Sequence, residues 1–449
     1  MKTTPKISRL FSFGLLLATT QVSLAQTANL NVQSLKLKNG LTVLALEDHA
    51  VPTVSYYTVF KVGSRNERPG ITGLSHLFEH MMFNGSAKYK PKVFDQIIEA
   101  GGGSSNAFTN SDTTEYFEDF STQTLDSVLL LEADRMKALK LDKANIEQER
   151  GIVKEERRVN TDNSIPGSMN ELLENNAFVA HPYRWDTIGF MKDLDAITLS
   201  DAQTYFKTYY APNNAVVAVV GDFNAKTLFA KMKTYFEEIP SQTPPRPVVN
   251  SEPEQTGEKR IVYHRTAELP AVTFGYHTIS YLQADDSVLD LLSVILTGGE
   301  SSRLYKTLVY EKQIATYVGA SNDSRIDPGL FVFSAQVREG HTTAEIEAAV
   351  YAELDNIAKN GVTERELQKA KNGQLIGFQK RFTTNNGRAG LLAEYEALRG
   401  GWKNIGDFLP KYEKVTIGDL KRAAKTYFSD RNRTVITLIP EVRAGDVKP

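Results

Sequence analysis

Short runs of apolar residues recur at matching places in the two halves of this chain. Residues 216–220 and residues 435–439 are almost entirely apolar, and each run follows a Thr-Tyr-Phe helix end and a turn asparagine. Residues 54–60 and 271–276 form a second matching pair. Runs of this length and composition predict buried strands. We therefore predict two distant repeats of one α+β unit, with strands at its ends and helices between them.

A stretch rich in proline and polar residues separates these halves. Four prolines fall within residues 240–247, and polar residues continue to Gly257, which is typical of an extended linker. We predict an N-terminal domain over residues 26–240, a linker over residues 241–257 and a C-terminal domain over residues 258–449. Each domain is expected to be an antiparallel-rich sheet covered by helices on one side.

The first 25 residues have a different character from the rest. Three basic residues open the chain, residues 10–19 are largely apolar, and residues 23–25 form a small-x-small cleavage signal before Gln26. This order predicts a cleavable signal peptide over residues 1–25 and a periplasmic or secreted mature chain. The alternative is a frayed N-terminal tail.

Composition excludes several classes of function. The 449 residues carry a net charge of −2, so no basic field is available to attract nucleic acid. No apolar stretch reaches the length of a membrane span. There is no cysteine, which excludes disulfides, thiol catalysis and a lipoprotein anchor. Apolar residues make up 41% of the chain, enough for large cores in two or more domains.

The segment His-Leu-Phe-Glu-His at residues 76–80 carries two of the seven histidines. On a helix a step of four residues advances about 400°, so His76 and His80 leave the same face. Two such imidazoles and one further carboxylate form a zinc site with an open fourth position. Glu79 shares this face and is free to act as a base on a bound water. This inverted order is a recorded peptidase signature.

A histidine pair at this spacing also occurs on solvated helix faces, so the context must be weighed. Apolar residues flank the segment on both sides, and the stretch stops at Gly85, as a buried helix would. Histidines in an apolar helix need polar partners, because an unpaired buried polar group costs free energy.

A third ligand is sought among the acidic residues of a well-defined element. Residues 147–158 predict a charged helix with Ile152 and Val153 turned inward. Glu149 and Glu156 are seven apart and share nearly one face, whereas Glu155 points about 100° away. Taken alone, this run favours a solvated helix face over a metal site.

The two segments together resemble the pitrilysin-type (inverted zincin) metallopeptidases of family M16, which include insulin-degrading enzyme and the mitochondrial processing peptidases. The resemblance rests on His-x-x-Glu-His at residues 76–80 followed by Glu-Arg-x-Ile-Val-x-Glu-Glu at residues 149–156. Further segments that resemble the family in the same order are residues 101–117, 181–183, 188–189, 209–214, 221–222, 327–331 and 361–363. The likeness covers nearly the whole mature chain, and it implies two similar halves.

The resemblance implies a role for each residue of the first motif. His76, His80 and Glu156 would bind one Zn²⁺ per chain. Glu79 would be the general base. Glu149 would support the ligands without binding the metal itself.

The resemblance also implies where a peptide substrate would lie. Asn106, Ala107, Phe108 and Thr109 match the family's Asn-Ala-x-Thr strand, which would be an edge strand beside the zinc helix. An unpaired edge accepts an extended peptide as a further strand. From the residues alone, an ordinary strand after the glycine turn of residues 101–103 is the simpler interpretation.

The second half departs from the family pattern in two ways. Residues 296–300 replace the zinc motif, so this half is expected to be metal-free. Tyr317 matches a catalytic tyrosine of the family, but Tyr310 stands where an arginine is expected, and Arg303 is the nearby cation. We therefore predict the zinc subunit of a heterodimer with a homologous metal-free partner. A homodimer is the alternative.

The sequence thus predicts an exported zinc metalloendopeptidase that hydrolyses peptides or unfolded polypeptide segments. Two other classes compete with it. A structural or peptide-binding subunit of the same family usually lacks the motif residues, which are intact here. A zinc hydrolase acting on another substrate class is separated from a peptidase by cleavage assays.

Overall fold

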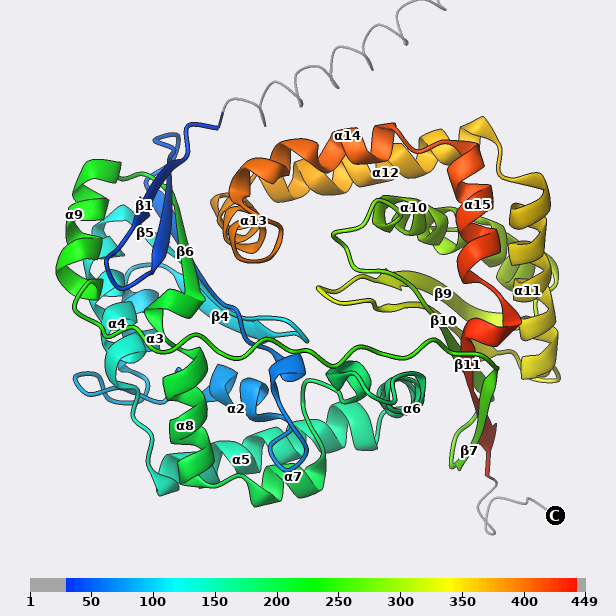
Figure 1. Ribbon diagram of the computed structural model, residues 1–449, viewed down its shortest axis with the longest axis horizontal. Helices are drawn as coiled ribbons and strands as arrows, with labels where there is room; N and C mark the ends of the chain where they lie inside the picture. Colours follow the sequence, from blue (N-terminus) through cyan, green and yellow to red (C-terminus); the bar gives the residue numbers. More distant parts are fainter. Residues whose placement is uncertain (1–29, 442–449) are drawn as a thin grey trace, which may run out of the picture.

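Two halves, each built on one β-sheet, make up the computed structural model, which describes residues 30–441 (Figure 1). The signal peptide predicted over residues 1–25 lies outside the described residues. No helix of the described part is both long and apolar enough to cross a membrane.

The first sheet has six strands, and its most apolar strand lies in the interior. Its order is β1 (Gln33–Lys36), β2 (Thr42–Glu47), β6 (Ala215–Gly221), β3 (Thr53–Phe60), β5 (Thr114–Ser121) and β4 (Ser104–Thr109). Only the β2–β6 pair is parallel. Every residue of β6 is buried, as its run of valines requires.

The second sheet repeats this arrangement without the first strand. Its order is β7 (Lys259–Arg265), β11 (Arg433–Pro440), β8 (Ala271–His277), β10 (Leu330–Val337) and β9 (Ala315–Asp323). Again one pair, β7–β11, is parallel and the others are antiparallel. The predicted α+β fold of two similar halves, each with a mainly antiparallel sheet, is therefore confirmed.

Each half covers one face of its sheet with its own helices. In the first half these include α2 (Leu74–Met81), α3 (Val93–Ala100), α4 (Leu125–Ala138), α8 (Leu199–Tyr209) and α9 (Ala225–Phe236). In the second half they include α10 (Asp286–Thr297), α11 (Thr343–Asn360) and α15 (Ile417–Tyr427). The remaining helices are α5 (Lys143–Arg157), α6 (Ile165–Ala177), α7 (Met191–Ala196), α12 (Glu364–Phe382), α13 (Asn385–Leu398) and α14 (Phe408–Glu413).

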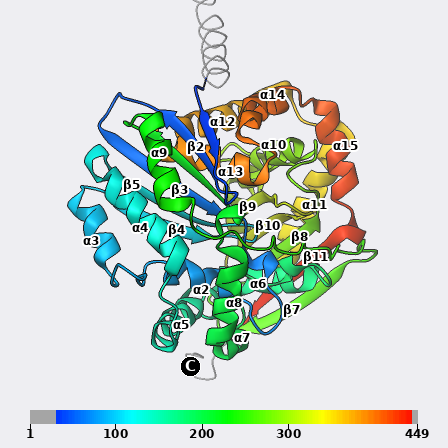
Figure 2. The ribbon, with the colours of Figure 1, turned by 60° about the vertical axis from the view of Figure 1, so that its left-hand side comes forward.

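The expectation that helices cover only one face of each sheet is wrong. Helix α13, from the second half of the chain, packs on β3 and β6 of the first sheet. Helix α6, from the first half, packs on β8 and β11 of the second sheet. Figure 2 shows α4 and α9 on one face of the first sheet, with α13 on the opposite face. The halves exchange one helix each, so the interior strands of each sheet are covered on both faces.

The stretch predicted as a linker contains no helix or strand, and it runs along both halves (Figure 1). It is nevertheless tied down at Glu252. The carboxylate of Glu252 accepts three consecutive backbone N–H groups, from Val179, Ala180 and His181, at 2.8, 2.9 and 2.9 Å. The extended segment is thus anchored to the first half.

The exchange of α13 predicts that a cavity made in this helix weakens the first sheet. Leu392 is fully buried between α13 and that sheet. We expect Leu392→Ala to lower the free energy of unfolding by about 2–5 kcal/mol, because lost burial and a cavity both contribute. Hydrogen exchange should show faster opening of β6, far away in sequence. Ile376→Ala, at a site 52% exposed on α12, is the control and should cost less than about 0.5 kcal/mol. Equal effects of the two variants would contradict this account.

Candidate metal centre

Helix α2 presents its polar residues on one face because the opposite face is buried in the core. Leu74, Leu77, Phe78 and Met81 all pack into the core of the first half. His76, Glu79 and His80 fall between these positions and leave the helix toward α5. The apolar stripe therefore sets the direction of the two imidazoles.

The N-terminus of α2 is capped from outside the helix. Gly73 precedes the helix with φ of 87°, and it supplies no side chain to cap the first turn. The buried carboxylate of Glu67 accepts the N–H groups of Gly73 and Ser75 at 2.8 and 2.7 Å. Burial raises the pKa of Glu67 to about 8. These contacts fix the turn that carries His76.

Three donor atoms converge between α2 and α5. His76 Nε2 lies 3.7 Å and His80 Nε2 lies 3.4 Å from Glu156 Oε2. These separations are too long for good hydrogen bonds. Tetrahedral zinc with bonds near 2.1 Å separates its ligand atoms by about 3.4 Å, so the set fits this ion. Within residues 30–441, no other group of three or more His, Cys, Asp or Glu donors is close enough to share a metal.

The protonation of His76 suits a ligand. Burial, followed by the charge of His80, lowers the pKa of His76 to about 3, which keeps the imidazole neutral. Neutral imidazole is the form that binds a metal. Its Nδ1 is buried and has no hydrogen-bond partner among the described residues.

His80 is set in an acidic surrounding. Burial lowers its pKa, but the contact with Glu149 and the charges of Glu156 and Glu79 outweigh this and raise the pKa of His80. Glu149 Oε2 lies 3.5 Å from His80 Nδ1, on the side of the ring away from Glu156. Glu149 is buried and seven residues before Glu156 in the same helix. At 3.5 Å this contact is longer than a good hydrogen bond, and it places a carboxylate beside the second ring nitrogen of His80.

Helix α5 has the predicted register at its acidic residues but not at Ile152. Its buried stripe is Ile146, Glu149, Val153 and Arg157. Ile152 is 48% exposed, so the prediction that it turns inward is wrong. It precedes Val153 by one residue, a rotation of about 100° away from the stripe. Glu155 is likewise turned out, where it accepts a hydrogen bond from Arg158 at 2.7 Å.

Glu79 lies beside the three donor atoms without being one of them. Its Oε2 is 4.0 Å from His76 Nε2, and it accepts the hydroxyl hydrogen of Thr109 at 2.7 Å. Burial raises the pKa of Glu79, although the bond from Thr109 opposes this. The contact between Glu79 and Thr109 joins helix α2 to strand β4. No pattern in the sequence indicates this contact, because the two residues lie on separate elements.

Strand β4 is the last strand at one edge of the first sheet, and α2 packs beside it. Its side chains alternate, with Asn106 and Phe108 exposed and Ala107 and Thr109 partly buried toward α2. The N–H of Ala107 donates to the side chain of Asn106 at 2.8 Å, so this edge group is held by its own strand.

The residues predicted from the second half do not join this centre. Tyr317 is 57% exposed on β9, and no hydrogen bond or ion pair within residues 30–441 links it to the donor set. Tyr310 is also exposed. Arg303 donates to both oxygens of Glu366 at 2.6 and 2.7 Å and to Glu353 at 2.7 Å. Its guanidinium is therefore already occupied within the second half.

Comparison with known proteins identifies the family. The model of insulinase, peptidase family M16, matches residues 42–189, and that of the peptidase M16 inactive domain matches residues 196–374. The chain belongs to peptidase family M16. The two segments whose sequence resembles M16 peptidases, at residues 76–80 and 149–156, supply the donor atoms that converge between α2 and α5.

Several M16 relatives are similar over most of the chain. Zinc protease PqqE of Helicobacter pylori is 34% identical over 413 residues, covering 91% of this chain and 93% of the relative. The crystal structure of a protease from Helicobacter pylori has a TM-score of 0.88 at 34% identity, covering 91% and 99% of the two chains. The periplasmic protease PqqL of Escherichia coli shares the fold at 17% identity, with a TM-score of 0.75. That match covers 92% of this chain but 48% of PqqL.

The geometry of α5 predicts that two adjacent glutamates, Glu155 and Glu156, contribute very differently to zinc affinity. Glu156→Gln should weaken zinc binding by at least about 100-fold, since it removes a charged donor. Glu155→Gln should change it by less than about 2-fold, since Glu155 faces solvent. Metal analysis after competition with a chelator measures both. A loss of zinc in Glu155→Gln with zinc retained in Glu156→Gln would show that the assigned donor set is wrong.

Proposed function

We propose that this chain is the catalytic, zinc-binding subunit of an exported M16 metalloendopeptidase. The enzyme class predicted from the sequence, a zinc protease, is confirmed by the family to which the chain belongs. Residues 26–240 form the zinc-binding domain in this proposal, and residues 258–449 form the metal-free domain beyond the linker of residues 241–257. The observation that carries it is the convergence of His76, His80 and Glu156 beside Glu79.

His76, His80 and Glu156 hold one Zn²⁺ per chain in this proposal. A bound zinc ion would supply a Lewis acid that lowers the pKa of a coordinated water. Glu149 orients the ring of His80 through its second nitrogen. The three side chains come from two helices, and each helix packs its apolar side into the core of the first half.

Glu79 acts on the attacking water as the general base. Its raised pKa brings the carboxylate closer to the pH at which a base must both accept and return a proton. After it takes a proton from water, the same oxygen can pass that proton to the leaving amine. The hydroxyl of Thr109 steadies this oxygen at 2.7 Å.

The substrate is a peptide or an unfolded polypeptide segment that lies along β4. Residues Asn106 to Thr109 offer the backbone groups of an open edge, and an extended chain can add there as a further strand. The peptide must displace the amide of Asn106 from the N–H of Ala107. Thr109, at the end of β4, connects this strand directly to Glu79 through one hydrogen bond.

A second chain completes the active site. The carbonyl that is attacked needs donors for its developing negative charge. Tyr310 provides no cation, and Arg303 is held by Glu353 and Glu366. A homologous partner without His-x-x-Glu-His, but with the family's arginine and tyrosine, would supply these groups. A homodimer, in which Arg303 or another cation substitutes for the missing arginine, is the alternative.

The composition of residues 1–25 supports export in this proposal, and the mature chain would begin near Gln26. PqqL of Escherichia coli, which shares the fold, is a periplasmic protease. A site made only of His and Glu is compatible with an oxidising compartment, since it contains no thiol.

Glu79→Gln separates metal binding from hydrolysis. We expect the variant to keep its zinc and to lose about 10²–10⁴-fold of the peptidase rate, the usual contribution of a general base. Zinc content and cleavage of an unfolded protein substrate are measured on the same preparation. Full activity in Glu79→Gln would remove the proposed base. Zinc-loaded wild type that cleaves no peptide, even with its partner, would favour another class of hydrolase.

One isolation tests both export and assembly. Tagged protein recovered from a periplasmic extract should begin near Gln26 and should carry a metal-free homologous chain. The purified chain alone should bind zinc yet cleave peptides poorly, and the partner should restore cleavage. Full activity of the isolated chain, lost in Tyr317→Phe, would establish the homodimer. Recovery of an uncleaved chain from the cytoplasm would contradict export.

A further inference from the structure

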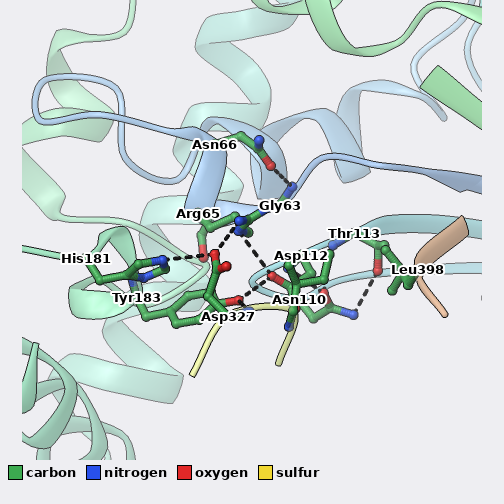
Figure 3. Close-up of polar contacts among 12 residues, drawn as sticks. Gly63, Arg65, Asn66, Asn110, Asp112, Thr113, His181, Tyr183, Asp327 and Leu398 are labelled. Atoms are coloured by element: carbon green, nitrogen blue, oxygen red, sulfur yellow. Dashed lines mark hydrogen bonds and ion pairs between the residues drawn. The ribbon is translucent and has the colours of Figure 1, made fainter. Parts of the chain in front are cut away.

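The strand proposed to bind the substrate ends in a turn, residues 110–113, that the second half holds from outside (Figure 3). Asp112 in this turn is 7% exposed. One of its carboxylate oxygens accepts the backbone N–H of Ile326 at 2.9 Å. The other accepts the hydroxyl hydrogen of Tyr183 at 2.7 Å. One side chain therefore bridges the β4–β5 turn of the first half and the β9–β10 turn of the second.

A second carboxylate reinforces the same contact. Asp327 accepts hydrogen bonds from Arg65 and from His181 Nε2, the latter at 3.0 Å (Figure 3). His181 Nδ1 accepts the N–H of Tyr183 at 3.1 Å, so the ring proton lies on Nε2 and points to Asp327. The backbone N–H of Asp327 donates to the hydroxyl of Tyr183 at 3.1 Å. Tyr183 thus accepts from the second half and donates to Asp112.

Hydrogen bonds within the turn connect the contacts of Asp112 to the end of strand β4. Asn110 Oδ1 accepts the N–H groups of Asp112 and Thr113, both at 2.8 Å, which makes the turn rigid. Thr109, three residues before Asp112, donates its hydroxyl hydrogen to Glu79. The end of β4 is thereby fixed on one side by the general base and on the other by the second half.

Stability alone is a poor explanation for this cluster. Buried ionic groups gain little net free energy over apolar residues of similar size, because removing charges from water is costly. What such a network provides is one defined geometry. Three residues of the cluster, His181, Tyr183 and Asp327, belong to segments at 181–183 and 327–331 that resemble the family and that the metal centre does not use.

We infer that Asp112 is a positioning residue, through which the metal-free half sets the place of the substrate strand relative to Glu79. This inference rests on the proposed function, since it assumes that peptides bind along β4. The second half then contributes to catalysis without touching the metal. It does so by holding the end of the strand against which the peptide lies.

The test uses the full chain, with its partner where one is found, in the zinc-loaded Glu79→Gln background. The probe is a fluorescein-labelled peptide about ten residues long that the wild type cleaves. We expect Asp112→Asn to weaken peptide binding about 10-fold, the effect of losing a buried hydrogen bond. Hydrogen exchange of the β4 amides should quicken, and zinc affinity should stay within about 2-fold of the parent.

Asp134→Asn is the matched control. Asp134 is also 7% exposed in the first half, and it accepts one hydroxyl, from Ser86 at 2.6 Å, and one backbone N–H, from Lys88 at 2.9 Å. A general loss of stability should be similar in both variants. Only Asp112→Asn should weaken peptide binding and free the β4 amides.

Tyr183→Phe removes only the hydroxyl and leaves the contact of Asp112 with Ile326 in place. This variant is used if Asp112→Asn does not fold, and we then expect peptide affinity to fall about 3-fold. Unchanged peptide affinity, or a parallel loss in Asp134→Asn, would overturn the inference. So would a fall in zinc affinity equal to the fall in peptide affinity. Failure of the proposed function is distinct from these results, because the wild type would then cleave no peptide.

Discussion

The interior strands of both sheets are apolar on both faces, and the fold depends on covering each of these faces. Strand β6 shows the constraint directly. Val217 and Val219 point into the core made by the helices of the first half, whereas Val216 and Val220 point into the core made with α13. On the second sheet, Val435 belongs to one core and Ile436 and Leu438 to the other. Because a strand that is apolar at every position must be buried on both sides, each half has to obtain a helix from the other.

The candidate metal centre lies between α2 and α5, on the sides of these helices that do not pack into the core. Helix α2 is fixed by its apolar stripe and by Glu67 at its start, and α5 is fixed by its own buried stripe. The polar residues His76, His80, Glu156 and Glu79 therefore lie between the two helices and beside the edge strand β4. The chemistry of the site is thus a consequence of how two amphipathic helices share one core.

The sequence predicted the parts that depend on local periodicity. His76 and His80 are four apart on one helix, so their common face follows from helix geometry, and the register of Glu149, Glu155 and Glu156 follows from the same rule. The continuous apolar runs indicated buried strands. Interpreting those runs as covered on one side was the error, since alternation would be expected for a strand with one wet face. Ile152 was misplaced for a simpler reason, because an apolar residue does not have to face the core.

Contacts between distant segments could not be predicted in this way. The bond from Thr109 to Glu79, the contact of Asp112 with Ile326 and the capture of Glu252 by three N–H groups each join elements whose relative place no period defines. The family resemblance marked residues 181–183 and 327–331 as special, but only the structure brings His181 and Asp327 within 3.0 Å.

The exchange of α6 and α13 has a consequence for any attempt to divide the protein. A fragment that carries one sheet with only its own helices leaves apolar residues of that sheet exposed to water, and such a surface favours association with other chains. A cut within residues 241–257 therefore does not divide the chain into two independently folding units.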